Sequence, residues 1–441
     1  MIITSKFITK IKAAWFRSQL RVLFLSIKHL YWPSLFSDKP IVEVYLALND
    51  PHSFMLVQVL ADIEQRFAIK FKLYLVYKAV PGVTIHPKLM RNWALNDANY
   101  ISKQYGLKSI SSLPTAKALL TGQQIWQLSP KTVESAENIF YQTWFGEFTE
   151  FYSTSTPVIN FQIKNQQRLI RKGHYLSAAI FFAGDWFIGI DRLFFLEDRL
   201  TKLGLNLTND KSKYHANQLA CCSVTAVESS EEKAPIQLHN THVCEVYISL
   251  RSPYSYLGFI KVKKLAQKYQ VPMVIKPVVP MVMRGLNVPI SKMRYTYIDA
   301  NREAKLAHIP FRAYNDPIGQ GIVNCYQIFS YAEKNNKSVA FIEATFEAIY
   351  VKNLDVAQSH VIQTICHDIG LDYNQALEHA KENDWQQWSD THQAELEQLG
   401  LWGVPCFKYD DISCWGQDRL VQIEQAMINN SPTSQAKVSK G

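Results

Sequence analysis

The residues whose types and spacing could do chemistry lie in one short segment. Residues 252–257 read Ser-Pro-Tyr-Ser-Tyr-Leu and follow a stretch of alternating apolar residues. Serine suits the N-cap of a helix and proline its first position, so Ser252-Pro253 predicts a helix start. The N–H groups at a helix N-terminus lack intrahelical partners and carry a partial positive charge, which favours an anion. Ser252 is therefore either a plain helix cap or a hydroxyl that donates to an anion bound at the helix start.

This segment occurs twice in the chain, with informative differences. Residues 43–54 read E-V-Y-L-A-L-N-D-P-H-S-F, and residues 245–256 read E-V-Y-I-S-L-R-S-P-Y-S-Y, at an offset of 202. A second matching block, at 189–193 and 416–420, has an offset of 227, so the second half contains 25 additional residues. A period near 200 residues is too long for a solenoid repeat and predicts two copies of one domain.

The copies differ at two positions that bear on chemistry. Asp50 stands where the second copy has Ser252, and Ala178 stands where it has Pro405. A carboxylate is favourable at a helix N-terminus by itself, but it would repel a bound anion. We therefore expect the first copy to be degenerate and to serve packing or to shape the second site.

The length of 441 residues also favours two domains over a single core. Changes in composition along the chain predict five parts. In order they are 1–39 (a basic amphipathic N-terminal helix), 40–205 (the first domain), 206–240 (a polar linker), 241–428 (the second domain) and 429–441 (a polar tail).

The net charge of +9 is concentrated at the N-terminus, where residues 1–40 contain seven Lys or Arg and one Asp. The nearly neutral remainder argues against a nucleic-acid partner. The basic residues Lys6, Lys10, Arg17, Arg21 and Lys28 fall on one helical stripe. This predicts either a helix on an anionic membrane surface, through residues 6–28, or a helix docked on its own domain. Its apolar stretches are too short for a membrane span or a secretory signal.

Seven cysteines are present, an odd number with no Cys-x-x-Cys and no zinc-like spacing. This pattern favours a reducing compartment. We therefore predict a cytoplasmic protein without a metal site, peripheral to the inner membrane face if the N-terminal helix binds lipid. Cys221-Cys222 in the linker is either a redox-reactive pair or two incidental thiols, and Cys406 is either a reactive thiol or a buried strand residue.

The element pattern of the second half positions these residues. Residues 243–250 and 271–279 are β-prone and flank a helix that begins at Pro253, which predicts a parallel strand pair with a right-handed crossover. A mainly helical stretch follows over 280–400. Two short strands are then expected around the turn signal Asp410-Asp411, and a closing helix after them. The first half follows the same α/β plan with a smaller helical insertion.

Three motifs in this order resemble the DsbA-like superfamily, which has a thioredoxin fold with an inserted helical domain. They are Ser-Pro-Tyr-Ser-Tyr-Leu at 252–257, Gly-Val-Pro at 403–405 and Trp-Gly-Gln-Asp-Arg-Leu at 415–420. Within that superfamily the second half is most similar to 2-hydroxychromene-2-carboxylate isomerases and kappa-class glutathione transferases. The resemblance covers 241–428 and, more weakly, 40–205. It implies an α/β fold of two tandem thioredoxin-like domains, each with an inserted helical subdomain.

The resemblance also implies a cofactor, glutathione, and residues that hold it. Ser252 would be the catalytic residue, because its hydroxyl would stabilise the glutathione thiolate. Pro405 would be the cis-proline that turns the backbone of Val404 toward the cysteinyl part of glutathione. The implied cofactor-binding residues are Val404, Pro405, Gly416, Gln417, Asp418, Asn287 and Lys292. Asp418 could instead only stabilise a helix start. Tyr295, Asp299 and Arg302 either line the same cleft or lie on an exposed helix face, and we expect the exposed face.

The function expected from these residues is a glutathione-dependent isomerase or transferase acting on a small aromatic or conjugated electrophile. The alternative is a non-catalytic tandem thioredoxin-like scaffold that binds peptides or a partner. A third hypothesis, thiol–disulfide exchange, would depend on Cys406 or the Cys221-Cys222 pair. Serines occupy both positions at which the disulfide oxidoreductases of the superfamily carry cysteines, so dithiol exchange cannot run at the helix start itself.

Overall fold

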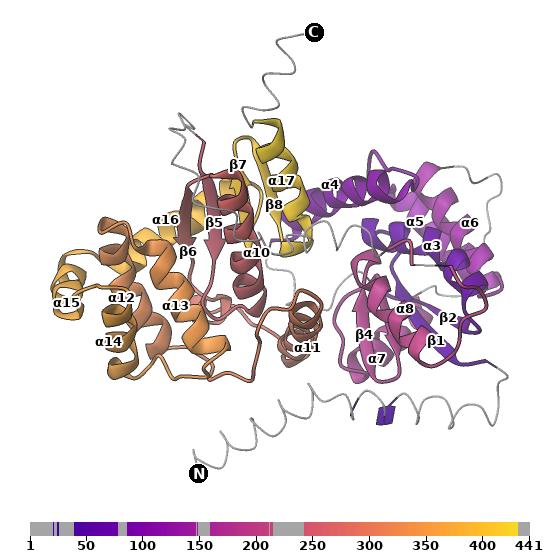
Figure 1. Ribbon diagram of the computed structural model, residues 1–441. Helices are drawn as coiled ribbons and strands as arrows, with labels where there is room; N and C mark the ends of the chain where they lie inside the picture. The colour runs from indigo at the N-terminus through magenta and orange to yellow at the C-terminus, as the bar shows by residue number, and fades with distance from the viewer. Residues whose placement is uncertain are drawn as a thin grey trace, which may run out of the picture. The chain divides into compact units, whose positions relative to one another are not determined.

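The computed structural model describes residues 39–77, 86–146, 159–210 and 242–430, together with residues 21, 24–25, 148 and 212–214. The described chain divides into two compact units (Figure 1). The first unit contains the described residues up to 214 and the short stretch Pro289–Tyr295. The second unit contains the other described residues from 242 onward. Cys221-Cys222 and the polar tail from residue 431 lie outside the described residues.

The second unit is built on a four-stranded sheet in the order β6-β5-β7-β8. Strand β5 (Cys244–Ile248) leads through helix α10 (Pro253–Tyr269) to β6 (Met273–Pro277), which pairs with β5 in parallel as predicted. Strands β7 (Cys406–Tyr409) and β8 (Ile412–Trp415) form the predicted antiparallel hairpin, and β7 pairs antiparallel with β5. The carboxyl end of β5 therefore delivers the chain directly to the start of α10.

Helices occupy the stretch between β6 and β7, as the sequence predicted. In order they are η2 (Met281–Arg284), α11 (Ile290–Leu306), α12 (Gln320–Lys334), α13 (Ser338–Tyr350), α14 (Ser359–Asp368), α15 (Tyr373–Glu382) and α16 (Trp385–Gln398). A short 3-10 turn, η3 (Gln417–Arg419), and α17 (Leu420–Asn429) close the unit after β8. One apolar cluster, which includes Phe259 from α10, Phe346 from α13 and Phe407 from β7, joins the sheet to these helices.

The first unit has a sheet with the same arrangement, in the order β2-β1-β3-β4. Its β1–β2 pair is parallel, and its β1–β3 and β3–β4 pairs are antiparallel. The elements are β1 (Ile41–Leu46), α3 (Pro51–Arg66), β2 (Lys70–Leu75), α4 (Pro87–Tyr105), α5 (Ala116–Leu128), α6 (Val133–Phe145), α7 (Ile159–Arg171), β3 (Ala179–Phe182), β4 (Asp185–Ile188), η1 (Ile190–Arg192) and α8 (Leu193–Lys202). The position of each strand relative to its neighbours thus repeats between the two units.

The predicted basic stripe of the N-terminal helix is described at one residue, Arg21. Its side chain is 2% exposed, and it donates to Asp185 Oδ1 at 2.7 Å and to the Gly184 carbonyl at 3.2 Å. Leu25 lies over Gly184, where a Cβ atom would be only 2.6 Å from its Cδ1. At this residue the chain is docked on its own domain, so Arg21 does not belong to a lipid-facing stripe. The other four basic residues of the stripe lie outside the described residues.

Among the helices of the described residues, none is both long enough and apolar enough to span a bilayer.

Candidate functional site

Ser252 is the N-cap of α10, as the Ser-Pro pair predicted. Its backbone is extended (φ −90°, ψ 114°), and Pro253 occupies the first helical turn. The Ser252 hydroxyl oxygen accepts the N–H of Ser255 at 3.2 Å. Among the described residues, the hydroxyl hydrogen of Ser252 has no acceptor. The half-buried Ser252 is therefore able to donate to an anion placed at the helix start.

Ser255, at the second cysteine position of the superfamily, has a structural role. It is fully buried, and its hydroxyl accepts the N–H of Ser249 at 3.2 Å, which ties the start of α10 to the end of β5. The two serines of the motif thus differ: Ser255 faces the interior, and Ser252 remains partly accessible to solvent.

The Val404–Pro405 peptide bond is cis, as the family resemblance implied. Pro405 packs against α10 at Gly258, where a Cβ atom would lie 3.2 Å from Pro405 Cγ. Val404 is half-buried, and its backbone makes no hydrogen bond within the part of the chain that the structure describes. An extended ligand backbone could therefore pair with Val404 beside the helix start.

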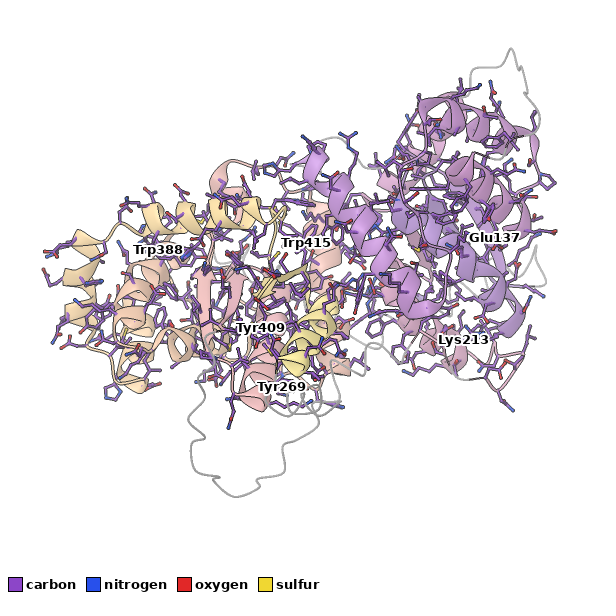
Figure 2. All side chains as sticks on the ribbon, turned by 90° about the horizontal axis from the view of Figure 1, so that it is seen from above. Glu137, Lys213, Tyr269, Trp388, Tyr409 and Trp415 are labelled. Atoms are coloured by element: carbon purple, nitrogen blue, oxygen red, sulfur yellow. The ribbon has the colours of Figure 1, made fainter. Side chains whose placement is uncertain are left out.

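The motif at residues 415–420 lies against the Gly-Val-Pro motif at 403–405. The Gly416 N–H donates to the Pro405 carbonyl at 2.9 Å, and the Gly416 φ of +88° lies in the region that favours glycine. Trp415, labelled in Figure 2, covers Gly403, where a Cβ atom would be 2.9 Å from the indole. The structure thus brings together the three motifs that the sequence separates by up to about 160 residues.

Gln417 is the most unusual polar side chain at this place. It is 1% exposed, and neither its amide oxygen nor its amide nitrogen has a hydrogen-bond partner among the described residues. An unsatisfied buried amide is costly, so such a group calls for a partner that the described residues do not supply. Asp418 follows on the same 3-10 turn and is half-buried.

The roles of Asn287 and Lys292 as glutathione-binding residues stay predictions. Asn287 is exposed in the loop before α11, and Lys292 is half-buried in the first turn of α11. Lys292 belongs to the stretch 289–295 that groups with the first unit, whereas Ser252 belongs to the second.

The expectation that Asp299 and Arg302 lie on an exposed helix face is wrong. Asp299 is fully buried; it accepts the Tyr254 hydroxyl at 2.6 Å and pairs with Arg302 at 2.5 Å. Tyr295 is also buried, at 8% exposure. Tyr254 lies two residues after Ser252, so this carboxylate orients the first turn of α10. The sequence contained a hint that Asp299 is not a simple surface residue, because an aspartate, Asp97, occupies the matching position of the first copy of the repeat.

The described cysteines do not form a redox site. Cys406 is fully buried, its Sγ lies 2.8 Å from the Gly403 carbonyl, and burial raises the pKa of its thiol well above the usual range. A thiol with a raised pKa is a poor nucleophile, so Cys406 is the buried strand residue of the two alternatives. No group of three or more potential metal ligands occurs in the described parts of the chain.

The comparison with protein families agrees with this geometry. Residues 243–427 match the family model of the DSBA-like thioredoxin domain. The second half of the chain is a DsbA-like thioredoxin domain. It is similar to a 2-hydroxychromene-2-carboxylate isomerase of Sphingobium xenophagum, with 23% identity over 197 residues, which are 43% of this chain and 100% of that protein.

Two further similarities concern the same half. The DsbA-like domain is 26% identical over 199 residues to a 2-hydroxychromene-2-carboxylate isomerase of Pseudomonas putida, which covers 42% of this chain and 94% of that protein. A solved structure of a 2-hydroxychromene-2-carboxylate isomerase has 22% identity and a TM-score of 0.38, and the match covers 42% of this chain and 95% of that one.

The helix start of the first unit differs from that of the DsbA-like domain. Asp50 is the N-cap of α3, and its carboxylate accepts from the hydroxyls of Ser53 and Ser177, both at 2.8 Å. His52 lies beside it and contacts Asp97 through Nε2 at 2.9 Å. The place at which Ser252 offers a hydroxyl is thus occupied here by a buried, fully hydrogen-bonded carboxylate.

The pKa values of His52 and Asp50 in this cluster are shifted from their ordinary values. Burial would lower the pKa of His52, but the two carboxylates Asp50 and Asp97 outweigh it and raise that pKa to about 10. Burial would raise the pKa of Asp50, but His52, Ser177 and Ser53 lower it. The Nδ1 of His52 is 3.8 Å from Asp50, which is an ion-pair distance rather than a hydrogen bond. At neutral pH the cluster is an imidazolium between two carboxylates.

Proposed function

We propose that the DsbA-like domain is a glutathione-dependent isomerase or transferase that acts on a small aromatic or conjugated electrophile. The observation that carries the proposal is the Ser252 hydroxyl, which caps α10 through its oxygen and keeps its hydrogen available. The names of the two curated relatives support the isomerase class. Neither cysteine of the disulfide oxidoreductases is present to support a redox reaction at the same place.

Glutathione, when bound, would supply a thiolate that adds to an electrophilic carbon of the substrate and, in an isomerisation, leaves again unchanged. The residues of the chain would lower the pKa of that thiol. Ser252 would donate its hydroxyl hydrogen to the sulfur, which favours the charged form. The N-terminus of α10 adds a partial positive charge at the same place.

The surroundings of Ser252 fit a peptide with a free α-amino acid end. Val404 offers backbone groups to an extended peptide, and the buried amide of Gln417 has an unmet donor and an unmet acceptor. Gln417 and Asp418 would hold the γ-glutamyl end, with Gly416 leaving room for its approach. Pro405 joins these groups, because it contacts α10 and accepts from the Gly416 N–H.

We infer further that the first unit is a degenerate copy that arose by tandem duplication. The repeated motifs and the shared strand order support this relationship. The Asp50 carboxylate would repel a thiolate, and its hydrogen bonds to Ser53 and Ser177 already use the donors at that helix start. One glutathione per chain is therefore expected.

Calorimetric titration of the full chain with glutathione tests the proposal. We expect one site, with the pKa of the bound thiol, followed by its thiolate ultraviolet absorbance, well below that of free glutathione. Ser252→Ala should raise that pKa by about 1–2 units, because a hydrogen bond to a charged group contributes about 1.5–3 kcal/mol. Asp50→Ala is the matched control, since it removes the corresponding N-cap in the other unit and should leave the bound thiol unchanged.

Two outcomes would decide against an enzyme of this class. If glutathione does not bind the wild-type chain, the alternative of a non-catalytic tandem scaffold is favoured. If glutathione binds but Ser252→Ala leaves the pKa of its thiol unchanged, Ser252 is only a helix cap.

A further inference from the structure

Helix α7 of the first unit buries Leu169 together with two glutamines and leaves two isoleucines exposed. Its inward residues Gln162 and Gln166 are 3% and 8% exposed, whereas Ile163 and Ile170 are 40% and 47% exposed. Surface helices usually turn an apolar stripe inward and polar residues outward. The outward isoleucines therefore need an explanation that packing within the unit does not give.

The inward amides have a clear structural task. Strand β2 is at the edge of its sheet, and α7 satisfies backbone groups at its end. Asn165 Nδ2 donates to the Leu75 carbonyl at 2.8 Å, and the Tyr77 N–H donates to Gln166 Oε1 at 3.1 Å. Buried backbone groups require such partners. Hydrogen bonds to the edge strand and the buried side chain of Leu169 thus hold α7 in place, and the two exposed isoleucines do not contribute to this attachment.

The charge of α7 points to an anionic partner. Residues 159–172 contain four basic residues and no acidic residue. Two of these, Arg168 and Lys172, pair with Glu43 at 2.5 Å and 2.8 Å. The other two, Lys164 and Arg171, are exposed and make no ion pair with any described residue.

An exposed basic residue follows each of the two exposed isoleucines, about 100° further round the helix. Lys164 directly follows Ile163, and Arg171 directly follows Ile170, seven residues or about two turns later. The two isoleucines therefore lie on one stripe of the helix, and the two cations without an ion-pair partner among the described residues lie on a neighbouring exposed stripe. Tyr77, which is 39% exposed, donates its backbone N–H to Gln166 and so lies next to α7.

We propose that this α7 surface, formed by Tyr77, Ile163, Lys164, Ile170 and Arg171, binds an anionic phospholipid membrane. Isoleucines that insert shallowly, with long cationic side chains that reach the phosphates, are the pattern of an interfacial helix. Basic residues are attracted to anionic lipid headgroups, and tyrosine is favoured at the membrane–water interface.

Co-sedimentation of the full chain with vesicles tests this surface. We expect binding to vesicles of phosphatidylglycerol and phosphatidylcholine at low salt, and little binding to phosphatidylcholine alone. The double variants Ile163→Ser with Ile170→Ser, and Lys164→Glu with Arg171→Glu, should each reduce the bound fraction at least tenfold. The matched control is Leu120→Ser with Leu128→Ser, which removes two leucines of α5 that are 52% and 60% exposed.

Three results would overturn the proposal. The wild-type chain could fail to bind the anionic vesicles. Both α7 double variants could bind as well as the wild type, which would assign membrane binding to another segment, such as residues 6–28. The α7 variants could instead dissociate an oligomer in size-exclusion chromatography without a loss of vesicle binding, which would make α7 a protein interface. All substitutions are at exposed positions, and thermal melting would confirm that the variants fold.

Discussion

The substitution Gly258→Ala tests whether α10 and the cis-proline segment lie close together because residue 258 lacks a side chain. An alanine Cβ there would lie 2.8 Å from Phe407 Cζ and 3.2 Å from Pro405 Cγ. Phe407 is fully buried, so its ring cannot move into solvent, and the proline ring is rigid. The variant must therefore move α10 away from β7 by a few tenths of an ångström.

Two opposing effects set how much Gly258→Ala changes the stability of the domain. Alanine in a helix interior is favoured over glycine by about 1 kcal/mol. Overpacking a filled core costs about 1–3 kcal/mol. The steric term should win, because the nearest contact is shorter than real Cβ atoms make and the neighbours are buried. We expect a net loss of about 1 kcal/mol, which lowers the melting temperature of a domain of this size by about 2–4 °C.

Thermal melts and glutathione titration of the full chain would measure the effect. The affinity for glutathione should fall together with stability, because Ser252 and Pro405 would be displaced relative to one another. Phe407→Leu provides the matched test, since it removes the contacting ring atoms. The double variant should lose less stability than the two single losses add up to. A higher melting temperature for Gly258→Ala, with glutathione affinity unchanged, would refute this account of the packing.

Two further predictions concern titratable groups. The pKa of His52 is raised to about 10, above its ordinary value near 6.5, so its stabilisation is complete below about pH 6.5 and is lost as the pH rises through about 10. The pKa shift of His52 corresponds to at most ~5 kcal/mol of stability, and because its side chain is 20% exposed, solvent screening should reduce this to roughly 2 kcal/mol. The melting temperature should therefore fall more steeply with pH above pH 8 in the wild type than in His52→Gln. An equal pH dependence of the two melting temperatures would contradict the ion pairing of His52 with Asp50 and Asp97. Cys406 should resist alkylation by iodoacetamide in the native protein and react once the chain is unfolded, as peptide mass mapping would show; rapid native labelling would contradict its burial.

Much of the second unit followed from local sequence patterns. Alternation and the Ser-Pro cap gave β5 and the start of α10, and the turn signal at Asp410-Asp411 gave the β7–β8 hairpin. These features depend on neighbours within a few residues, so local physical chemistry suffices. The cis bond before Pro405 was different, because it was predicted only through the resemblance to a family.

The burial of polar residues could not be read from the same patterns. Asp299 lies in a helix with alternating polar and apolar residues, and its burial depends on Tyr254, 45 residues earlier. Likewise, nothing local marks Gly258 as a contact of Pro405, 147 residues later. Periodicity describes which face of a helix is apolar, but the partner of a buried carboxylate or glycine is set by tertiary structure.

The two helix starts show why a single substitution would not convert one into the other. In the first unit the Ser53 hydroxyl accepts from the Ala47 and Ala178 N–H groups and donates to Asp50. Proline has no N–H, so Pro405 cannot make the bond that Ala178 makes. Replacing Asp50 by serine would remove the repelling charge, yet the Ala178 N–H would still point toward the helix start rather than toward a ligand. A thiolate site of the kind proposed for the second unit would therefore require both differences, the serine and the proline, which occur together at Ser252 and Pro405.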